Sequence, residues 1–179
     1  MEKAQEKLLL LRPTEKYISQ YEDYRREFLE FGGSMDGAGG LRRLESGRAW
    51  LDEVERFSRP ETVPEGKVPS TQFILVRASD ERLLGMLQLR RELNAYLARV
   101  AGHIGYSVRP SERRKGYAKR MLAMALPEAK ALGLERVMIS CTTDNEASRR
   151  TILANGGVYE STVFDETDGE TLERYWITL

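Results

Sequence analysis

The stretch from Ser107 to Met121 combines a dense cluster of basic side chains with a glycine. Between Arg109 and Arg120 there are six basic residues and one acid, and Gly116 lies among them. A solvated charge cluster requires no glycine, and the start of a helix requires no arginines. Glycine allows the backbone to approach a ligand closely or to adopt a positive φ angle. Together these features predict a site where an anion is bound by backbone N–H groups as well as by side chains.

The pattern within this stretch indicates which kind of anion. Residues 113–118 read Arg-Arg-Lys-Gly-Tyr-Ala, an R-x-x-G-x-A pattern that follows a strand-like segment and opens a helix-like one. It is neither the Gly-x-x-x-x-Gly-Lys-Ser/Thr loop nor the Gly-x-Gly-x-x-Gly loop. The first N–H groups of a helix have no intrahelical partner, and the helix dipole is positive there. A phosphate group is therefore the expected ligand.

Apolar periodicity predicts the elements that must position this site. Asp144 is predicted to cap the last helix, and Pro127 to kink or divide the helix that contains it. Helices are predicted over residues 15–31, 45–57, 116–132 and 144–154, and strands over 8–12, 72–77, 83–90, 102–108, 136–142, 158–164 and 171–178. This order predicts an α/β fold in one domain over residues 1–179, with a mixed sheet of six or seven strands flanked by helices.

Composition sets bounds on the class of protein. The chain has 179 residues, with 28 Lys and Arg against 28 Asp and Glu, so no general basic face is available for nucleic acid. Its single cysteine, Cys141, excludes an intrachain disulfide and is typical of a reducing compartment. The apolar run from Leu8 to Leu11 is too short for a signal segment or a membrane span. These features predict a cytoplasmic protein that binds neither nucleic acid nor a membrane.

The R-x-x-G-x-A pattern, in this position, resembles the signature of the GNAT superfamily of N-acetyltransferases. The element order agrees with it, as do Asn145 at the start of a short helix and the Asn155-Gly156-Gly157 turn after that helix. The segments 89–94 and 102–108 are similar to an uncharacterised bacterial subgroup. The resemblance extends over about residues 73–159. It implies the acyl-CoA N-acyltransferase fold, acetyl-CoA as co-substrate without a metal, an amine acceptor, and a monomer or homodimer.

The resemblance also implies which residues bind acetyl-CoA. In the family, the end of the fourth strand aligns with the pantetheine arm and the acetyl carbonyl, and the R-x-x-G-x-A loop binds the pyrophosphate. A later asparagine contacts the pantetheine arm. The matching residues are Tyr106, Ser107 and Val108 on the strand, Arg113, Arg114, Lys115, Gly116, Tyr117, Ala118 and Lys119 in and after the loop, and Asn145 with Ser148 on the later helix.

Two positions depart from the family pattern. A glycine is common where Arg114 stands, which predicts a differently shaped turn. Many members protonate the leaving thiolate with a tyrosine, and counting from Asn145 that position is Ile152. The usual general acid is therefore absent or replaced.

Acetyl transfer requires a neutral amine, so a base would help. His103, the only histidine, is one candidate, and a satisfied histidine in a half-buried strand is the alternative. Glu92 is another candidate base, or else a surface ion-pair residue. The Tyr106 hydroxyl can polarise or protonate the sulfur, or the ring can be a core aromatic. Cys141 can carry an acyl group or be a buried structural thiol.

The segment of residues 32–70 stands apart as a helix-containing insertion. It holds five glycines between residues 32 and 40, and three prolines between residues 60 and 69. We expect it to shape the acceptor pocket and to move over it, and a packed helix that caps the sheet is the alternative.

Three functions stay open on the sequence alone. The first is an acetyl-CoA-dependent N-acetyltransferase that acts by direct attack in a ternary complex. The second is an acyl-CoA-binding or sensing module of the same fold without turnover. The third is a nucleic-acid-binding domain, which would lack an aromatic platform.

Overall fold

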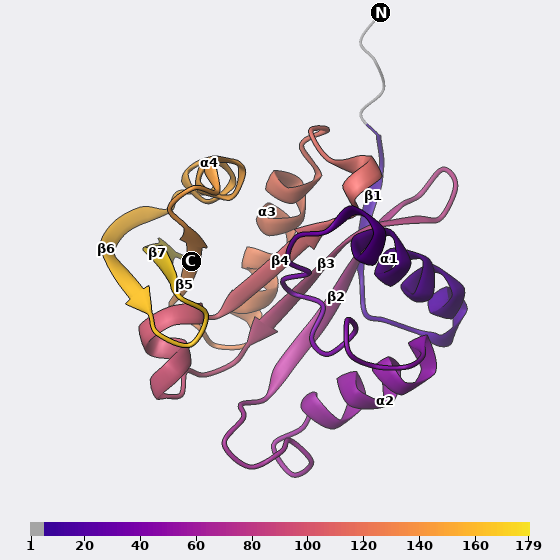
Figure 1. Ribbon diagram of the computed structural model, residues 1–179, viewed down its shortest axis with the longest axis horizontal. Coiled ribbons are helices and arrows are strands. Elements are labelled where there is room, and N and C mark those ends of the chain that lie inside the picture. The colour runs from indigo at the N-terminus through magenta and orange to yellow at the C-terminus, as the bar shows by residue number, and fades with distance from the viewer. Residues whose placement is uncertain (1–5) are drawn as a thin grey trace, which may run out of the picture.

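The computed structural model describes residues 6–179 (Figure 1). The strands are β1 (Leu8–Leu11), β2 (Ser70–Arg77), β3 (Arg82–Arg90), β4 (Ile104–Val108), β5 (Arg136–Thr142), β6 (Val158–Asp165) and β7 (Glu170–Thr178). The helices are α1 (Ile18–Phe31), α2 (Gly47–Phe57), α3 (Tyr117–Ala131) and α4 (Glu146–Leu153), with short helical turns at Glu15–Tyr17, Leu97–Ala101 and Pro110–Glu112. None of the helices in this part of the chain has both the length and the apolar character needed to cross a bilayer.

The seven strands form two sheets rather than one continuous sheet. The first has the order β1-β2-β3-β4 and the second β5-β7-β6, and every paired strand is antiparallel. Between β4 and β5 there is only an isolated bridge that joins Gly102 and Ile139. The mixed α/β fold class is confirmed, and the two sheets diverge beyond this bridge (Figure 1).

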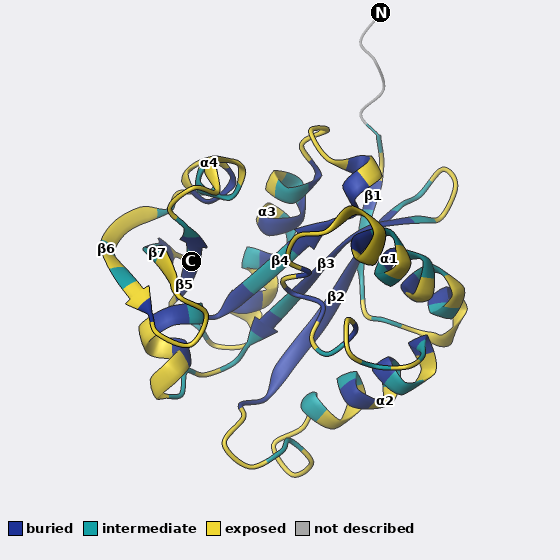
Figure 2. Cartoon of the chain, viewed as in Figure 1, coloured by how far each residue is buried: buried dark blue, intermediate teal, exposed yellow. Residues whose placement is uncertain are grey.

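The first sheet is covered on both faces, and β2 shows this most clearly. Phe73 and Leu75 point into a core with α3, whereas Ile74 and Val76 point into a second core with α1 and α2. Successive side chains of a strand point to opposite faces, so a strand that is covered on both faces is apolar throughout. Figure 2 shows the resulting band of buried residues through the central strands.

Four details differ from the sequence predictions. The structure adds a π-helical turn at Leu97–Ala101, and β4 begins at Ile104 because Gly102 has a φ of +68°. Pro127 does not divide α3, since core packing holds both sides of the helix together. Asn145, not Asp144, caps α4, because its Oδ1 accepts a hydrogen bond from the Ser148 N–H at 3.0 Å.

Candidate functional site

The loop before α3 presents backbone N–H groups to the surface. Gly116 is the N-cap of α3 with φ +78°, and Arg114 has φ +64°. Among residues 6–179, nothing accepts a hydrogen bond from the backbone N–H groups of residues 114–119. A Cβ atom added at Gly116 would meet no atom within 4 Å. The loop is therefore an open row of donors at the positive end of a helix, which suits a phosphate group.

The basic side chains of the loop are all exposed, and two of them also contact other residues of the protein. Arg113 donates from Nε to the carbonyl of Val108 at 3.2 Å, and its guanidinium lies 5.4 Å from the centre of the Phe28 ring. Lys115 pairs with the buried carboxylate of Glu112 at 2.7 Å. Arg114 and Lys119 extend into solvent. These two have the freedom to reach a bound anion, while the other two fix the loop.

Tyr117 and Ala118 contribute backbone rather than side chains. The Tyr117 ring is buried in the core, and its hydroxyl accepts a hydrogen bond from Arg77 at 3.3 Å. Ala118 packs against the same core. These side chains lie on the side of α3 that faces the sheet, so they point inward. The outer side of the first turn therefore presents backbone N–H groups.

Arg114 adopts a left-handed backbone conformation, in the position where a glycine is common in the family. A non-glycine residue there costs about 1–2 kcal/mol. We therefore expect Arg114→Gly to raise the free energy of unfolding by about 0.5–1 kcal/mol, after the entropic cost of glycine in the unfolded chain. Denaturant titration measures this. Arg114→Ala, which removes the same side chain but keeps the positive φ, is the control and should not stabilise the protein.

At β4 the three predicted strand residues have different surroundings. Tyr106 extends across the divergence of the sheets, and its hydroxyl lies 2.7 Å from the Ser148 Oγ on α4. The Ser107 Oγ lies 2.9 Å from the Tyr24 hydroxyl oxygen, and the Val108 side chain packs in the core. Burial raises the pKa of Tyr106 well above its ordinary value, with a smaller opposing effect of Ser148. Tyr106 and Ser148 thus meet between β4 and α4, where the resemblance implies the pantetheine arm.

Ile152 is fully buried, one helical turn after Ser148 on the same face of α4. No acidic group therefore stands at this position. The hydroxyl of Tyr106 reaches the same region of α4 from the opposite strand.

His103 lies buried where β4 and β5 are still joined. Its backbone N–H donates to the Met138 carbonyl at 2.7 Å, and its Nδ1 accepts from the Met138 N–H at 2.9 Å. The neutral ring therefore carries its proton on Nε2. Burial, with the nearby charges of Arg90 and Arg136, lowers the pKa of His103 to about 4. These contacts account for a structural role, and they leave neither ring nitrogen of the neutral imidazole ready to accept a proton.

His103 gives the fold a defined pH dependence. Because its folded-state pKa lies below the ordinary 6.5, the unfolded chain takes up a proton first as the pH falls. Between pH 6.5 and about 4, this should lower the free energy of unfolding by about 1.4 kcal/mol per pH unit. We expect the stability advantage of the wild type over His103→Asn, which keeps a hydrogen-bond acceptor, to shrink between pH 7 and pH 5. Chemical denaturation at each pH measures it, and a constant difference would contradict this account.

The other two nucleophile and base candidates have contrasting surroundings. Glu92 is exposed just after β3, and no ion pair to it is formed within residues 6–179. Cys141 is buried, and burial raises the pKa of its thiol to about 11. A thiol that stays protonated is a poor nucleophile, so the surroundings of Cys141 fit a structural residue.

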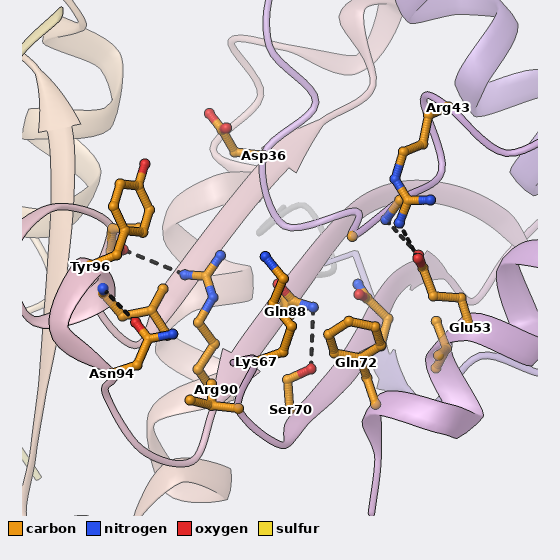
Figure 3. Close-up of a pocket in the computed structure, with 17 residues that line it drawn as sticks. Asp36, Arg43, Glu53, Lys67, Ser70, Gln72, Gln88, Arg90, Asn94 and Tyr96 are labelled. Atoms are coloured by element: carbon orange, nitrogen blue, oxygen red, sulfur yellow. Dashed lines mark hydrogen bonds and ion pairs between the residues drawn. The ribbon is translucent and has the colours of Figure 1, made fainter. Parts of the chain in front are cut away.

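A cavity of about 450 Å³ opens on the other face of the first sheet, between α2, the glycine-rich loop and the ends of β2 and β3 (Figure 3). Sequence reasoning missed its most prominent acid, Asp36. The next residue, Gly37, packs so closely on β4 that a Cβ atom there would lie 2.2 Å from the Gly105 carbonyl oxygen. Asp36 is thereby held near Tyr106. The signal in the sequence was an acid within the glycine cluster.

Comparisons with known proteins agree with this fold. The family model for the acetyltransferase (GNAT) family matches residues 41–156. A search of curated proteins gave no significant match. Solved structures similar in fold include a ribosomal-protein-S5-alanine acetyltransferase from Vibrio fischeri, with TM-score 0.69 and 17% identity over 99% of this chain and 95% of that one.

Two further similar structures contain CoA or a CoA derivative. RimJ from Mycobacterium smegmatis, in complex with CoA-disulfide, has TM-score 0.71 and 21% identity over 96% of this chain and 81% of that one. Spermidine N-acetyltransferase from Vibrio cholerae, in complex with CoA and spermine, has TM-score 0.63 and 17% identity over 96% of this chain and 95% of that one. At these identities the structures show a shared fold, and the family model covers more than half of the chain. The chain therefore belongs to the acetyltransferase (GNAT) family and is an acetyltransferase.

Proposed function

We propose that the protein transfers the acetyl group of acetyl-CoA to a primary amine by direct attack in a ternary complex. The observation that supports this most is the convergence of three features at β4. The open row of N–H donors follows its end, the sheets diverge along it, and the loop that brings Asp36 to the cavity packs on its other side through Gly37 and Gly105. Donor and acceptor can thus approach one strand from opposite faces.

On the donor side, the pyrophosphate of acetyl-CoA would accept hydrogen bonds from the N–H groups of residues 114–119, with Arg114 and Lys119 adding charge. The pantetheine arm would then pass between β4 and α4, beside Ser148 and the capping Asn145. Beyond the bridge at Gly102, β4 is paired along one edge only, with β3. Backbone N–H groups on its other edge would stabilise the developing oxyanion.

Tyr106 would assist departure of the thiolate. Its raised pKa keeps the hydroxyl protonated throughout the neutral range, so it can donate a hydrogen bond to the sulfur as negative charge develops. In this role it replaces the tyrosine that many family members carry where Ile152 stands.

On the acceptor side, Asp36 would orient the amine. Its carboxylate accepts a hydrogen bond from the Ser34 hydroxyl at 2.6 Å, which fixes one oxygen and leaves the other available. A carboxylate there attracts the ammonium form and accepts a hydrogen bond from the neutral amine. Glu92 would not reach this amine directly, because it does not line the cavity.

Residues 32–70 would form much of the acceptor pocket. Asp36, Gly40, Glu53 and Lys67 from this segment line the cavity, while Trp50 anchors it by donating from Nε1 to the Ala38 carbonyl at 2.7 Å. The anchored helix α2 agrees with the alternative of a packed helix. Movement would then be confined to the parts of the segment outside α2. Hydrogen exchange should then slow on acceptor binding at residues 32–36 and 58–69, and stay slow throughout at α2 and at the anchored Gly37 and Ala38.

The function is tested by mixing the protein with acetyl-CoA and a panel of amines, and by measuring released CoA as free thiol. Turnover that depends on an amine supports the proposal. The alternative is an acyl-CoA-binding module without turnover, which the isoleucine at position 152 favours. Tight binding of acetyl-CoA by calorimetry, with no thiol released by any amine, would support that alternative.

A further inference from the structure

The charged groups around the cavity indicate what kind of amine it accepts. Five charged side chains line it, namely Asp36, Arg43, Glu53, Lys67 and Arg90. Arg43 and Glu53 form an ion pair with each other, and Glu53 also accepts a hydrogen bond from the Gly40 N–H at 2.8 Å. Figure 3 shows this pair on one side of the cavity and Arg90 on the other, with Asp36 apart from both and its carboxylate directed away from Arg90. The pair holds the glycine-rich loop onto α2 and adds no net charge.

Arg90 and Lys67 are the two remaining cations. Arg90 donates from Nη1 to the Gly102 carbonyl at 3.1 Å, a neutral acceptor. Within residues 6–179 neither side chain has a carboxylate partner at ion-pair distance. Burial lowers the pKa of Arg90, and the charge of Asp36 raises it to a smaller extent. A half-buried guanidinium surrounded by carbonyl groups favours an anionic partner.

Arg90 also lies close to the reacting strand. A Cβ atom added at Gly105 would lie 3.8 Å from Arg90 Nη2 and 3.1 Å from the Gly37 backbone nitrogen. Nη2 and the loop that carries Asp36 therefore flank the same point of β4, one residue before Tyr106. If Arg90 binds one end of a small ligand, the atoms a few bonds away lie beside the site proposed for acetyl transfer.

A buried amide holds the loop of Gly37 against the floor of the cavity. Gln72 lines the cavity and is 4% exposed. Its Nε2 donates to the carbonyls of Gly37, Leu87 and Phe73, at 2.6, 3.1 and 3.2 Å, which fixes the orientation of the amide. Its Oε1 has no donor among the described residues. The amide is therefore held rigidly, with its nitrogen toward the loop of Gly37 and its oxygen enclosed by protein.

We infer that the acceptor is a small primary amine that also carries an anionic group, a carboxylate or a phosphate. The anionic group is bound by Arg90 and Lys67, and the ammonium group faces Asp36. This inference rests on the proposed function, because it takes the cavity as the acceptor site. A polyamine would place further positive charge beside Arg90 and Lys67, whereas an anionic amine carries one group opposite in charge to these cations and another opposite in charge to Asp36.

Matched acceptors test the inference. L-alanine is compared with L-alaninamide, and O-phosphoethanolamine with ethanolamine, so that each pair differs in the anionic group; spermidine is the cationic member. We expect at least one anionic amine to exceed its neutral partner at least tenfold in kcat/KM, after correction for the fraction of neutral amine. The two pairs distinguish a carboxylate from a phosphate. Equal or better use of the neutral amines or of spermidine would overturn the inference while leaving the proposed function intact.

Variants connect the preference to its residues. Arg90→Gln and Lys67→Gln should each reduce the ratio of anionic to neutral acceptor at least fivefold. Lys130→Gln, an exposed lysine on α3, removes the same charge on the opposite face of the sheet and should leave the ratio unchanged. A ratio unaffected by both cavity variants would overturn the inference, and near-ultraviolet circular dichroism verifies that each variant is folded.

Calorimetry on the CoA-loaded protein with the same amines separates the two proposals. Preferential binding of the anionic amines without turnover would contradict the proposed function. It would still support the inference that the cavity binds an amine with an anionic group. If no amine is turned over and none binds with a preference for the anionic member, both proposals are wrong.

Discussion

Gly116→Val should lower the affinity for acetyl-CoA at least tenfold, about 1.4 kcal/mol of binding free energy. Gly116 has φ +78°, which a β-branched residue adopts only with strain. The space beside its Cα is open, so the valine side chain would occupy the volume through which we propose that the pyrophosphate approaches the N–H groups of residues 114–119. Calorimetric titration with acetyl-CoA measures the change.

The control for this prediction lies at the other end of the same helix. Gly133 also has a positive φ, +87°, and a Cβ atom there would likewise meet nothing within 4 Å. Gly133→Val should therefore introduce similar backbone strain and leave acetyl-CoA binding unchanged. If both variants are folded and bind acetyl-CoA as well as the wild type does, the loop is not the pyrophosphate site.

Tyr106→Phe should reduce kcat about 10²-fold while changing the affinity for acetyl-CoA less than threefold. Phenylalanine keeps the aromatic ring between β4 and α4, but the hydroxyl that we propose to donate to the departing sulfur is gone. The loss of one donor directed at a developing charge is typically of this size. Steady-state kinetics with the best acceptor from the amine panel gives kcat, and calorimetry gives the affinity.

A second tyrosine shows whether the effect is specific to this position. Tyr159 on β6 has a hydroxyl 2.8 Å from Thr162 Oγ1, on an exposed part of the outer hairpin. Tyr159→Phe removes an equivalent hydroxyl and should leave kcat within a factor of two. A kcat for Tyr106→Phe within a factor of three of the wild type would show that the Tyr106 hydroxyl only holds α4 in place through Ser148.

The acids of the last hairpin illustrate a limit of reading charge from sequence. Residues 160–173 hold six acids, a linear pattern that fits either attraction of a cationic amine or a solvated hairpin. In the structure Glu160 pairs with Arg174, Glu173 pairs with Arg149, and Asp165 accepts a hydrogen bond from Tyr96. Arginines distant in sequence neutralise two of these carboxylates and a distant tyrosine hydroxyl satisfies the third, and a linear pattern does not contain that information.

Local sequence determined the elements and the anion loop. Periodicity of two and of 3.6 residues follows from backbone geometry alone, so β5 was predicted at its observed bounds and α1 and α3 to within a few residues. The R-x-x-G-x-A pattern identified the loop for the same reason, because a glycine before a helix exposes N–H groups regardless of the rest of the fold.

Tertiary structure alone decided which groups meet. The bridge between Gly102 and Ile139, followed by divergence of β4 and β5, gives two sheets where continuous pairing was equally compatible with the pattern. His103 became a buried hydrogen-bond acceptor through Met138, 35 residues away, and Asp36 reached β4 through the contact of Gly37 with Gly105. Such contacts depend on the packing of distant segments and on the burial it causes. Burial sets the pKa of a histidine or tyrosine, so the chemical role of each residue follows from the fold.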